Sequence, residues 1–244
     1  MNKDTIKFPA PANPNIEEVL DSFIEDRRRQ LKPATTRKYE DIVKLFKDSM
    51  DGYAYQYLDK GEAALFDNVY NAEGEAHREF CQVFGPEKIP SNVGEFLGYF
   101  MPRKVMCGKE LMKAAGTVMK KLGKWLNEQG YIDDEWAENM VKRGAEAVTN
   151  LPAAEELAEM LYEYANAHPT SKWTDEIEDY FTVEKVEPGK LHLSAFMDRG
   201  EDIIVVSVPK KITDLCKVGW DISLFLGKTS KGWKIIESGG VYTH

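Results

Sequence analysis

The chain has 244 residues, a hydrophobic fraction of 43% and five tryptophans, which is enough apolar material for one large or two modest folded domains and excludes a disordered chain. Its net charge is −9, but 15 acidic and four basic side chains lie between residues 133 and 187, so the acidity is local and does not exclude nucleic-acid binding elsewhere. No apolar run reaches the ~20 residues of a membrane span, and the N-terminus lacks the apolar core of a signal peptide. With three scattered cysteines, Cys81, Cys107 and Cys216, these features predict a cytoplasmic protein with free thiols and no membrane partner.

The N-terminal region predicts an extended arm followed by two helices. The first 14 residues contain three prolines and no apolar period. A helix is expected from Ile16, because Asn15 is a good N-cap with Glu18 at the third helical position. A second helix is expected from Pro33, whose fixed φ suits a first helical position. The residues predicted to be buried by this pair are Ile16, Val19, Leu20, Phe23, Ile24, Tyr39, Ile42, Val43 and Phe46.

Helical patterns continue to about residue 167. The expected helices lie at 61–71, 74–84, 92–101, 108–129, 133–147 and 152–167. The fourth is the most regular, with apolar residues at helical spacing from Leu111 to Leu126 and Gly130 as its terminator. Gly116 and Gly123 inside it lack the preceding strand of a dinucleotide fingerprint and are instead predicted to let another helix pack closely.

From about residue 180 the sequence alternates between apolar and polar residues. This pattern predicts strands at 181–187, 190–196, 203–208, 220–226 and 233–237. Five short strands in about 60 residues indicate a small barrel. The predicted fold class is therefore α+β and multidomain. It comprises a helical bundle at 1–132, an acidic helical connector at 133–180 and a small all-β barrel at 181–244, the last expected to fold separately.

Two sequence motifs of the helical region match motifs that occur together in one known domain family. LKPATTRKY at residues 31–39, followed by Leu45 and Phe46, matches a short loop and the start of a second helix, and GKWLNEQGYI at residues 123–132 matches the end of a last helix. Together they resemble the N-terminal core-binding (SAM-like) domain of phage-integrase-type tyrosine recombinases. The resemblance covers residues 16–132 and implies a domain that clamps DNA.

The chain departs from that family in four ways. Lys32 stands where a capping Ser is usual, Asp133-Asp134 replaces an Asn-Pro exit, and the centre from 51 to 95 is longer than the family needs. The catalytic half is also missing, because no histidine is followed by Arg in the His-x-x-Arg spacing and Tyr242 has no catalytic partners. We therefore expect no enzymatic activity, no cofactor and no small-molecule substrate.

Two basic segments are the candidates for a nucleic-acid interface. Residues 27–47 and 103–124 each carry a net charge of +6, and cationic side chains of a clamp would neutralise phosphates. The best candidates are Arg27, Arg28, Arg29, Arg37, Lys38, Lys120, Lys121 and Lys124. The alternative is an ordinary solvated helix face, and the clamp interpretation requires both segments to lie on one concave face.

Other candidate sites are weaker. Four aromatic residues of the barrel are candidates for stacking on bases, with core packing as the alternative: Phe196, Tyr242 and, above all, Phe225 and Trp233. Glu73, His77 and Cys81 stand at i, i+4 spacing, but one helix rarely closes a metal site, so no metal is expected. The leading functional prediction is a non-catalytic nucleic-acid-binding protein that grips duplex DNA. The alternative is a protein–protein interaction or scaffolding module.

Overall fold

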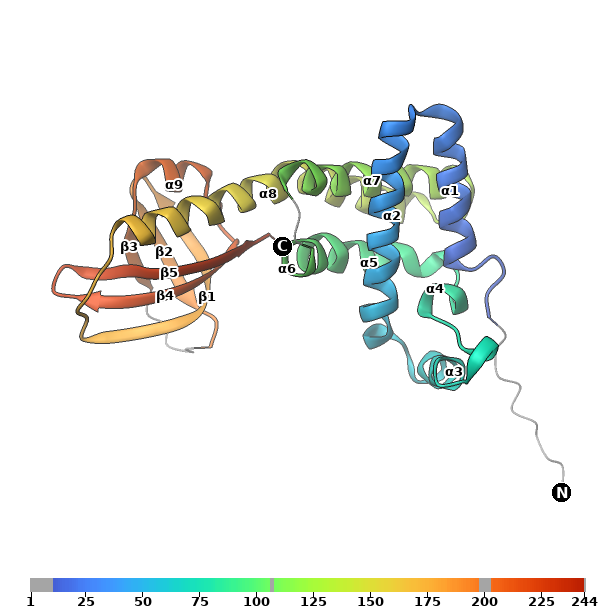
Figure 1. The fold of residues 1–244 in the computed structure, drawn as a ribbon, viewed down its shortest axis with the longest axis horizontal. Helices are drawn as coiled ribbons and strands as arrows, with labels where there is room; N and C mark the ends of the chain where they lie inside the picture. Colours follow the sequence, from blue (N-terminus) through green and yellow to red (C-terminus); the bar gives the residue numbers. More distant parts are fainter. Residues whose placement is uncertain (1–10, 106–107, 198–202, 244) are drawn as a thin grey trace, which may run out of the picture. The chain divides into compact units, whose positions relative to one another are not determined.

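The computed structural model describes residues 11–105, 108–197 and 203–243 (Figure 1). Contacts divide the chain into two compact units. Unit 1 comprises Met1–Leu97 and Ala114–Glu146, and unit 2 comprises Gly98–Lys113 and Ala147–His244. The first ten residues of the expected arm and Cys107 lie outside the described residues. Among the described residues, no helix has both the length and the apolar character needed to cross a membrane.

Unit 1 is helical. Its α-helices and short 3-10 turns are α1 (Ile16–Gln30), α2 (Pro33–Tyr53), η1 (Ala54–Tyr57), α3 (Lys60–Tyr70), η2 (Gly74–Ala76), α4 (Phe80–Val83), η3 (Pro86–Lys88) and α5 (Ile89–Glu95). It also takes most of α7 (Lys109–Glu128) and the first part of α8 (Asp134–Ala167). The predicted apolar faces of α1 and α2 are confirmed, since every residue assigned to them is buried. The capping box at Asn15 and Glu18 is also present.

Three predictions about the helices are wrong. The expected helix at 74–84 is split into η2 and α4, because His77 and Glu79 between them have extended backbone, with ψ of 138° and 165°. The helix expected at 92–101 begins at Ile89 and runs through a π-helical turn, η4 (Phe96–Phe100), into α6 (Met101–Lys104). The two acidic helices are one, since α8 continues through Pro152. Burial of Leu151 and Ala154 on either side of that proline explains how packing outweighs the lost hydrogen bond.

Close packing of α7 against another helix is confirmed. A Cβ added to Gly123 would lie 2.7 Å from the Cβ of Met140 on α8. Gly144 of α8 makes the reciprocal approach, because a Cβ there would lie 2.6 Å from the carbonyl oxygen of Gly116 and 2.8 Å from the backbone nitrogen of Lys120. Glycine is thus required on both helices where they cross.

Unit 2 contains a closed five-stranded barrel, as the sequence predicted. Its elements are η4, α6, the second part of α8, β1 (Asp175–Glu187), β2 (Lys190–Ala195), β3 (Ile204–Ser207), α9 (Lys210–Leu215), β4 (Asp221–Thr229) and β5 (Gly232–Tyr242). The strand order is β1-β2-β3-β5-β4, with β4 pairing back onto β1 and β3 parallel to β5. The short helix α9 was not predicted from the sequence, and β5 continues through Gly239 and Gly240 to Tyr242, beyond the expected end at residue 237.

The core of the barrel includes one face of α8. Ala154, Leu157, Leu161 and Ala165 are buried together with strand residues such as Phe181 and Leu226. In Figure 1 the later, yellow part of α8 runs along the barrel. The region expected to be a connector therefore supplies core side chains, and β1 begins at Asp175 rather than at residue 181.

Candidate nucleic-acid interface

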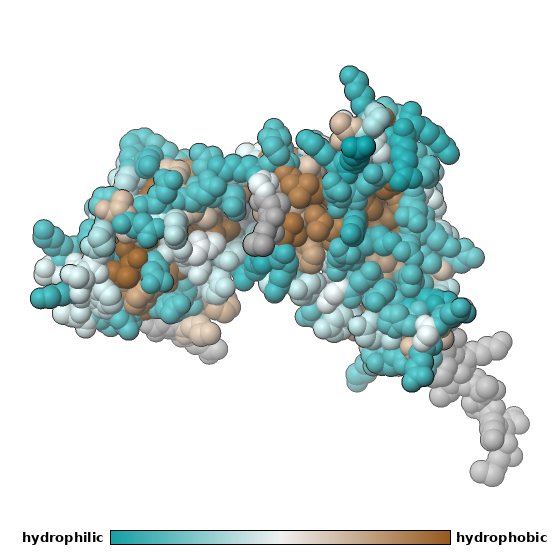
Figure 2. Space-filling model, in the orientation of Figure 1, coloured by the Kyte–Doolittle hydropathy of each residue, from teal (hydrophilic) through white to brown (hydrophobic). Residues whose placement is uncertain are grey.

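The strongest cationic feature of unit 1 is the turn between α1 and α2. The two helices lie side by side as an antiparallel hairpin (Figure 1), and residues 27–38 form its end. We call these residues the hairpin tip. The tip contains six cationic side chains and no carboxylate: Arg27, Arg28, Arg29, Lys32, Arg37 and Lys38. The surface at this end of the hairpin is strongly hydrophilic (Figure 2).

The three arginines at the end of α1 are already engaged. The Cζ atom of Arg27 lies 5.5 Å from the centre of the Phe23 ring, and its buried Nε has no hydrogen-bond partner among the described residues. Arg28 lies between Glu25 and Glu40, with 2.6 Å from its Nη2 to the Glu40 carboxylate. Hydrogen bonds to Glu40 and, to a smaller extent, to Glu25 raise the pKa of Arg28 above its usual value. Arg29 is more exposed and lies 3.6 Å from Asp26.

The cations at the start of α2 are free of such partners. Lys32, Arg37 and Lys38 are exposed, and none of them forms an ion pair with the part of the chain that the structure describes. The first turn of α2 holds no acidic residue, and the side chain of Lys32 makes no capping hydrogen bond. Because the N-terminal end of a helix carries a partial positive charge, α2 adds to the potential of these side chains.

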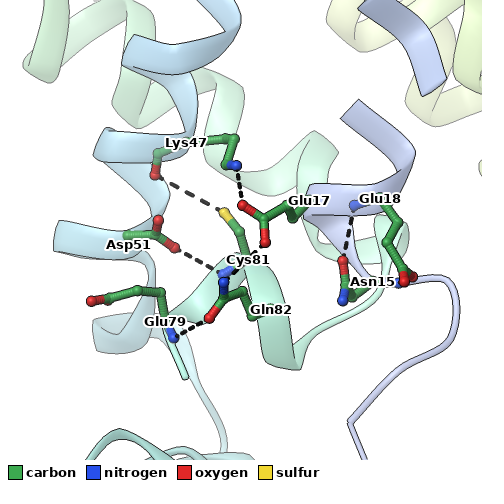
Figure 3. Close-up of polar contacts among 8 residues, drawn as sticks. All are labelled: Asn15, Glu17, Glu18, Lys47, Asp51, Glu79, Cys81 and Gln82. Atoms are coloured by element: carbon green, nitrogen blue, oxygen red, sulfur yellow. Dashed lines mark hydrogen bonds and ion pairs between the residues drawn. The ribbon is translucent and has the colours of Figure 1, made fainter. Parts of the chain in front are cut away.

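A polar network fixes the other end of the hairpin (Figure 3). Glu17 of α1 accepts hydrogen bonds from Lys47 of α2 and, at 3.0 Å, from the Nε2 of Gln82 of α4. Asp51 of α2 accepts a hydrogen bond of 2.8 Å from the backbone N–H of Cys81. These bridges join three helices, so the hairpin is held against α4 rather than swinging from its turn.

The charges of this network have shifted proton affinities. The hydrogen bond from Lys47 lowers the pKa of Glu17. Burial lowers the affinity of Lys47 for its proton, but Glu17 outweighs burial and the pKa of Lys47 is raised. Burial raises the pKa of Asp51, and it raises the pKa of the Cys81 thiol well above its usual range, so that this cysteine is an inert core residue.

The flank of the hairpin is acidic, unlike its tip. A groove of about 500 Å³ runs between α1 and α2. Its charged lining consists of the carboxylates Glu17, Asp21, Glu40, Asp48, Asp51 and Glu79 and the cations Arg28, Lys44 and Lys47. An excess of carboxylates repels a phosphate backbone. The tip is therefore the part of the hairpin that is more favourable for an anion.

The candidate lysines of α7 lie in different surroundings. Trp125 connects α7 to α1, because its Nε1–H donates to Asp26 at 2.8 Å and its ring lies 5.5 Å from that of Phe23. Lys120 instead lies where α7 meets Gly144 of α8, and Lys124 lines a groove with α8 residues. Lys121 is exposed. The rest of the second basic segment, residues 103–113, belongs to unit 2.

Three of the four candidate stacking residues of the barrel, Phe225, Trp233 and Tyr242, are half-buried. Phe225 packs edge-on against Trp173, with ring centres 5.9 Å apart. Trp233 packs against the barrel core beneath the amino group of Lys228. The fourth candidate, Phe196, is 75% exposed, and Tyr180, which was not among the candidates, is 39% exposed. The alternation of β1, with Phe181 buried, was the signal that places Tyr180 outside.

The i, i+4 group of Glu73, His77 and Cys81 does not share a helix. Glu73 and His77 flank the short turn η2, and His77 bonds to the Tyr70 carbonyl oxygen and to Glu79. Among the described residues, no three His, Cys, Asp or Glu side chains lie together as a group that could hold a metal ion.

No family model, no curated protein and no solved structure matches this chain.

Proposed function

We propose that this protein binds nucleic acid without catalysing a reaction on it, and that the hairpin tip is the main contact with the duplex backbone. The observation that carries the proposal is the tip itself: six cationic side chains, no carboxylate, and three exposed cations without an ion pair among the described residues. Cations without a carboxylate partner release counterions from phosphates at little cost, which is the main source of affinity for a nucleic-acid backbone.

The resemblance to the recombinase clamp supports the same assignment. Its first motif, residues 31–39, coincides with the tip and the start of α2. The network at the other end of the hairpin gives the tip a rigid support, and rigid presentation reduces the entropy lost on binding. Lys32 contributes a charge where the family usually has a capping Ser, which favours contact with phosphate over a capping role.

A salt titration of the full-length protein tests this proposal. Binding to a fluorescent duplex should weaken as salt rises, with a linear dependence of log affinity on log salt. Replacing Arg37 and Lys38 together by Ala should weaken binding several-fold to all sequences alike and reduce the salt slope by about two.

The matched control is the double replacement of Lys60 and Lys142 by Ala. Both lysines are exposed cations of unit 1 that lie outside the tip. This control removes the same charge and should leave the slope unchanged. Equal losses in both double variants, or undetectable binding by the unmodified protein at low salt, would overturn the proposal. Binding of a protein partner that is insensitive to salt would favour the interaction-module alternative.

A further inference from the structure

Arg103 of α6 lies among the rings of three tyrosines in unit 2. Its Cζ atom is 3.8 Å from the centre of the Tyr242 ring, 5.1 Å from that of Tyr180 and 5.3 Å from that of Tyr99. The next residue, Lys104, places its amino group 5.7 Å from the Tyr99 ring. These distances are those of cation–π contacts, so the guanidinium has a defined position on the barrel.

The backbone explains why these groups meet. Tyr99 and Arg103 are four residues apart in the helical run from η4 to α6, and such residues lie on one face. The run lies against the end of β5, because a Cβ added to Gly98 would be 3.3 Å from the carbonyl oxygen of Thr243. Tyr180 of β1 and Tyr242 of β5 have ring centres 5.8 Å apart.

Within the part of the chain that the structure describes, no carboxylate neutralises the charge of Arg103. The side chain is exposed, and no ion pair joins it to any carboxylate in residues 11–105, 108–197 and 203–243. Two carboxylates of the neighbouring strands are held by other donors. Asp179 accepts the backbone N–H groups of Tyr180 and Met197, and Asp221 accepts the hydroxyl of Thr182.

We propose that Arg103 and Lys104 form a preformed phosphate-binding site on unit 2. A guanidinium that stacks on a ring lies parallel to that ring, and its N–H groups point outward in the guanidinium plane. Two of these N–H groups can then bind two oxygens of a phosphate. The tyrosines have already restricted the side chain, so a phosphate gains this bidentate contact without the usual loss of rotamer entropy. Lys104 adds a second positive charge beside it. The source of the phosphate is the backbone of the bound nucleic acid, a step that rests on the proposed function.

The site itself is tested with inorganic pyrophosphate, which needs no nucleic acid. Titration into the full-length protein, labelled with ¹⁵N-arginine, should move the Nε–Hε resonance of Arg103 saturably. Arg103→Lys keeps the charge but loses the planar fork, and should weaken pyrophosphate binding about tenfold. Tyr242→Phe keeps the ring and should retain the affinity. Lys211→Ala, which removes another exposed cation of unit 2, is the control for a general loss of positive charge and should also bind normally.

The second arm uses a fluorescent oligonucleotide with the same variants. Weaker binding by Arg103→Lys than by Lys211→Ala would identify the nucleic-acid backbone as the source of the phosphate. A purely structural role for Arg103 would lower the melting temperature of Arg103→Lys but leave the pyrophosphate affinity unchanged, and that result would overturn the site.

The two proposals fail in different ways. If pyrophosphate moves the Arg103 resonance but no oligonucleotide binds, the phosphate site is retained and the nucleic-acid source is wrong. If oligonucleotide binding depends on Arg37 and Lys38 but neither probe responds to Arg103→Lys, the proposed function is retained and the site on unit 2 is wrong.

Discussion

The two units of this protein build their cores by different means. Unit 1 packs helices that approach closely at glycines and are tied by polar side chains, as at Gly144 and in the network of Glu17 and Asp51. Unit 2 closes a sheet into a barrel and completes its core with the apolar face of α8. Both units bury an apolar core, but unit 1 adds close glycine contacts and titratable side chains to it, whereas unit 2 relies on an apolar layer.

The same contrast applies to how the units hold cations. Arg28 in unit 1 is held by the carboxylates Glu25 and Glu40, so a phosphate has to compete with them. Arg103 in unit 2 is held by rings, which position the guanidinium without neutralising it. Counting basic residues along the sequence does not distinguish a cation paired with carboxylates from one held by rings. Only the second kind is available to an anion without competition from a carboxylate.

The largest expected effect tests whether α8 belongs to the core of the barrel. Leu157 is 0% exposed and lies in the same cluster as the strand residues, so Leu157→Ala should destabilise unit 2 by about 3 kcal/mol. Native-state hydrogen exchange should show faster exchange of the β-strand amides, with the α1–α2 amides much less affected. The control is Glu163→Ala at an exposed position of the same helix. Unchanged strand protection would mean that α8 is only a spacer.

The next prediction tests whether the stability of unit 1 depends on close helix packing, and it compares two Gly→Ala substitutions. Gly144→Ala places a methyl group against the backbone of α7 and should destabilise the protein by about 1–3 kcal/mol despite the better helix propensity of Ala. Gly52→Ala, in α2, meets nothing within 4 Å and should stabilise it by up to about 1 kcal/mol. Denaturant midpoints measure both changes. A shift in the same direction for both would show that the helices do not cross closely at Gly144.

The third effect tests the titratable basis of unit 1. Burial raises the pKa of Asp51, so the folded protein binds the proton of this carboxyl more tightly than the unfolded chain does. The free energy of unfolding therefore falls as pH rises from the usual pKa of an aspartate through the raised pKa of Asp51. Asp51→Asn removes that loss and keeps an oxygen for the Cys81 N–H. It should therefore be more stable than the unmodified protein at pH 7, on the order of 1 kcal/mol, and no more stable at about pH 3.

Glu17 gives the opposite sign and serves as the control. Its pKa is lowered by Lys47, so its stabilising contribution is present at neutral pH and is lost as pH falls through the lowered pKa. Glu17→Gln should thus be less stable at pH 7 and equal to the unmodified protein in acid. Parallel pH profiles for both variants would contradict the assignment of these charges.

The sequence predicts the fold where local patterns agree with tertiary packing. The apolar periods of α1, α2 and α7 and the alternation of the strands all belong to elements that bury one face, and these predictions are confirmed. The errors fall where packing overrides local preference. Pro152 was taken as a helix start, but burial on both sides keeps α8 continuous. Because α8 is acidic overall, its narrow apolar face was not recognised in the sequence. The packing of that face against the barrel strands shows it.

The candidate site is less accessible to sequence reasoning, for a physical reason. The charged residues of the hairpin tip lie close together in the sequence, so the sequence alone reveals them. The ion pair of Arg28 with Glu40 and the contacts of Arg103 with Tyr180 and Tyr242 join residues farther apart in sequence. Whether a cation is neutralised, free or held by rings is a property of tertiary structure.

The smallest expected effect returns to the two ways of holding a cation. Glu40→Gln removes one of the two carboxylate partners of Arg28 at the edge of the hairpin tip. It should tighten duplex binding about two- to threefold at low salt, because Arg28 then keeps only Glu25 and one repulsive charge is lost. The gain should vanish near 0.5 M salt, at roughly half the Debye length of physiological buffer. Glu138→Gln, at an exposed position on α8, makes the same change of charge away from the tip. An equal gain in both variants would assign the effect to net charge, whereas a gain confined to Glu40→Gln would show that the carboxylates beside Arg28 restrain its contact with phosphate.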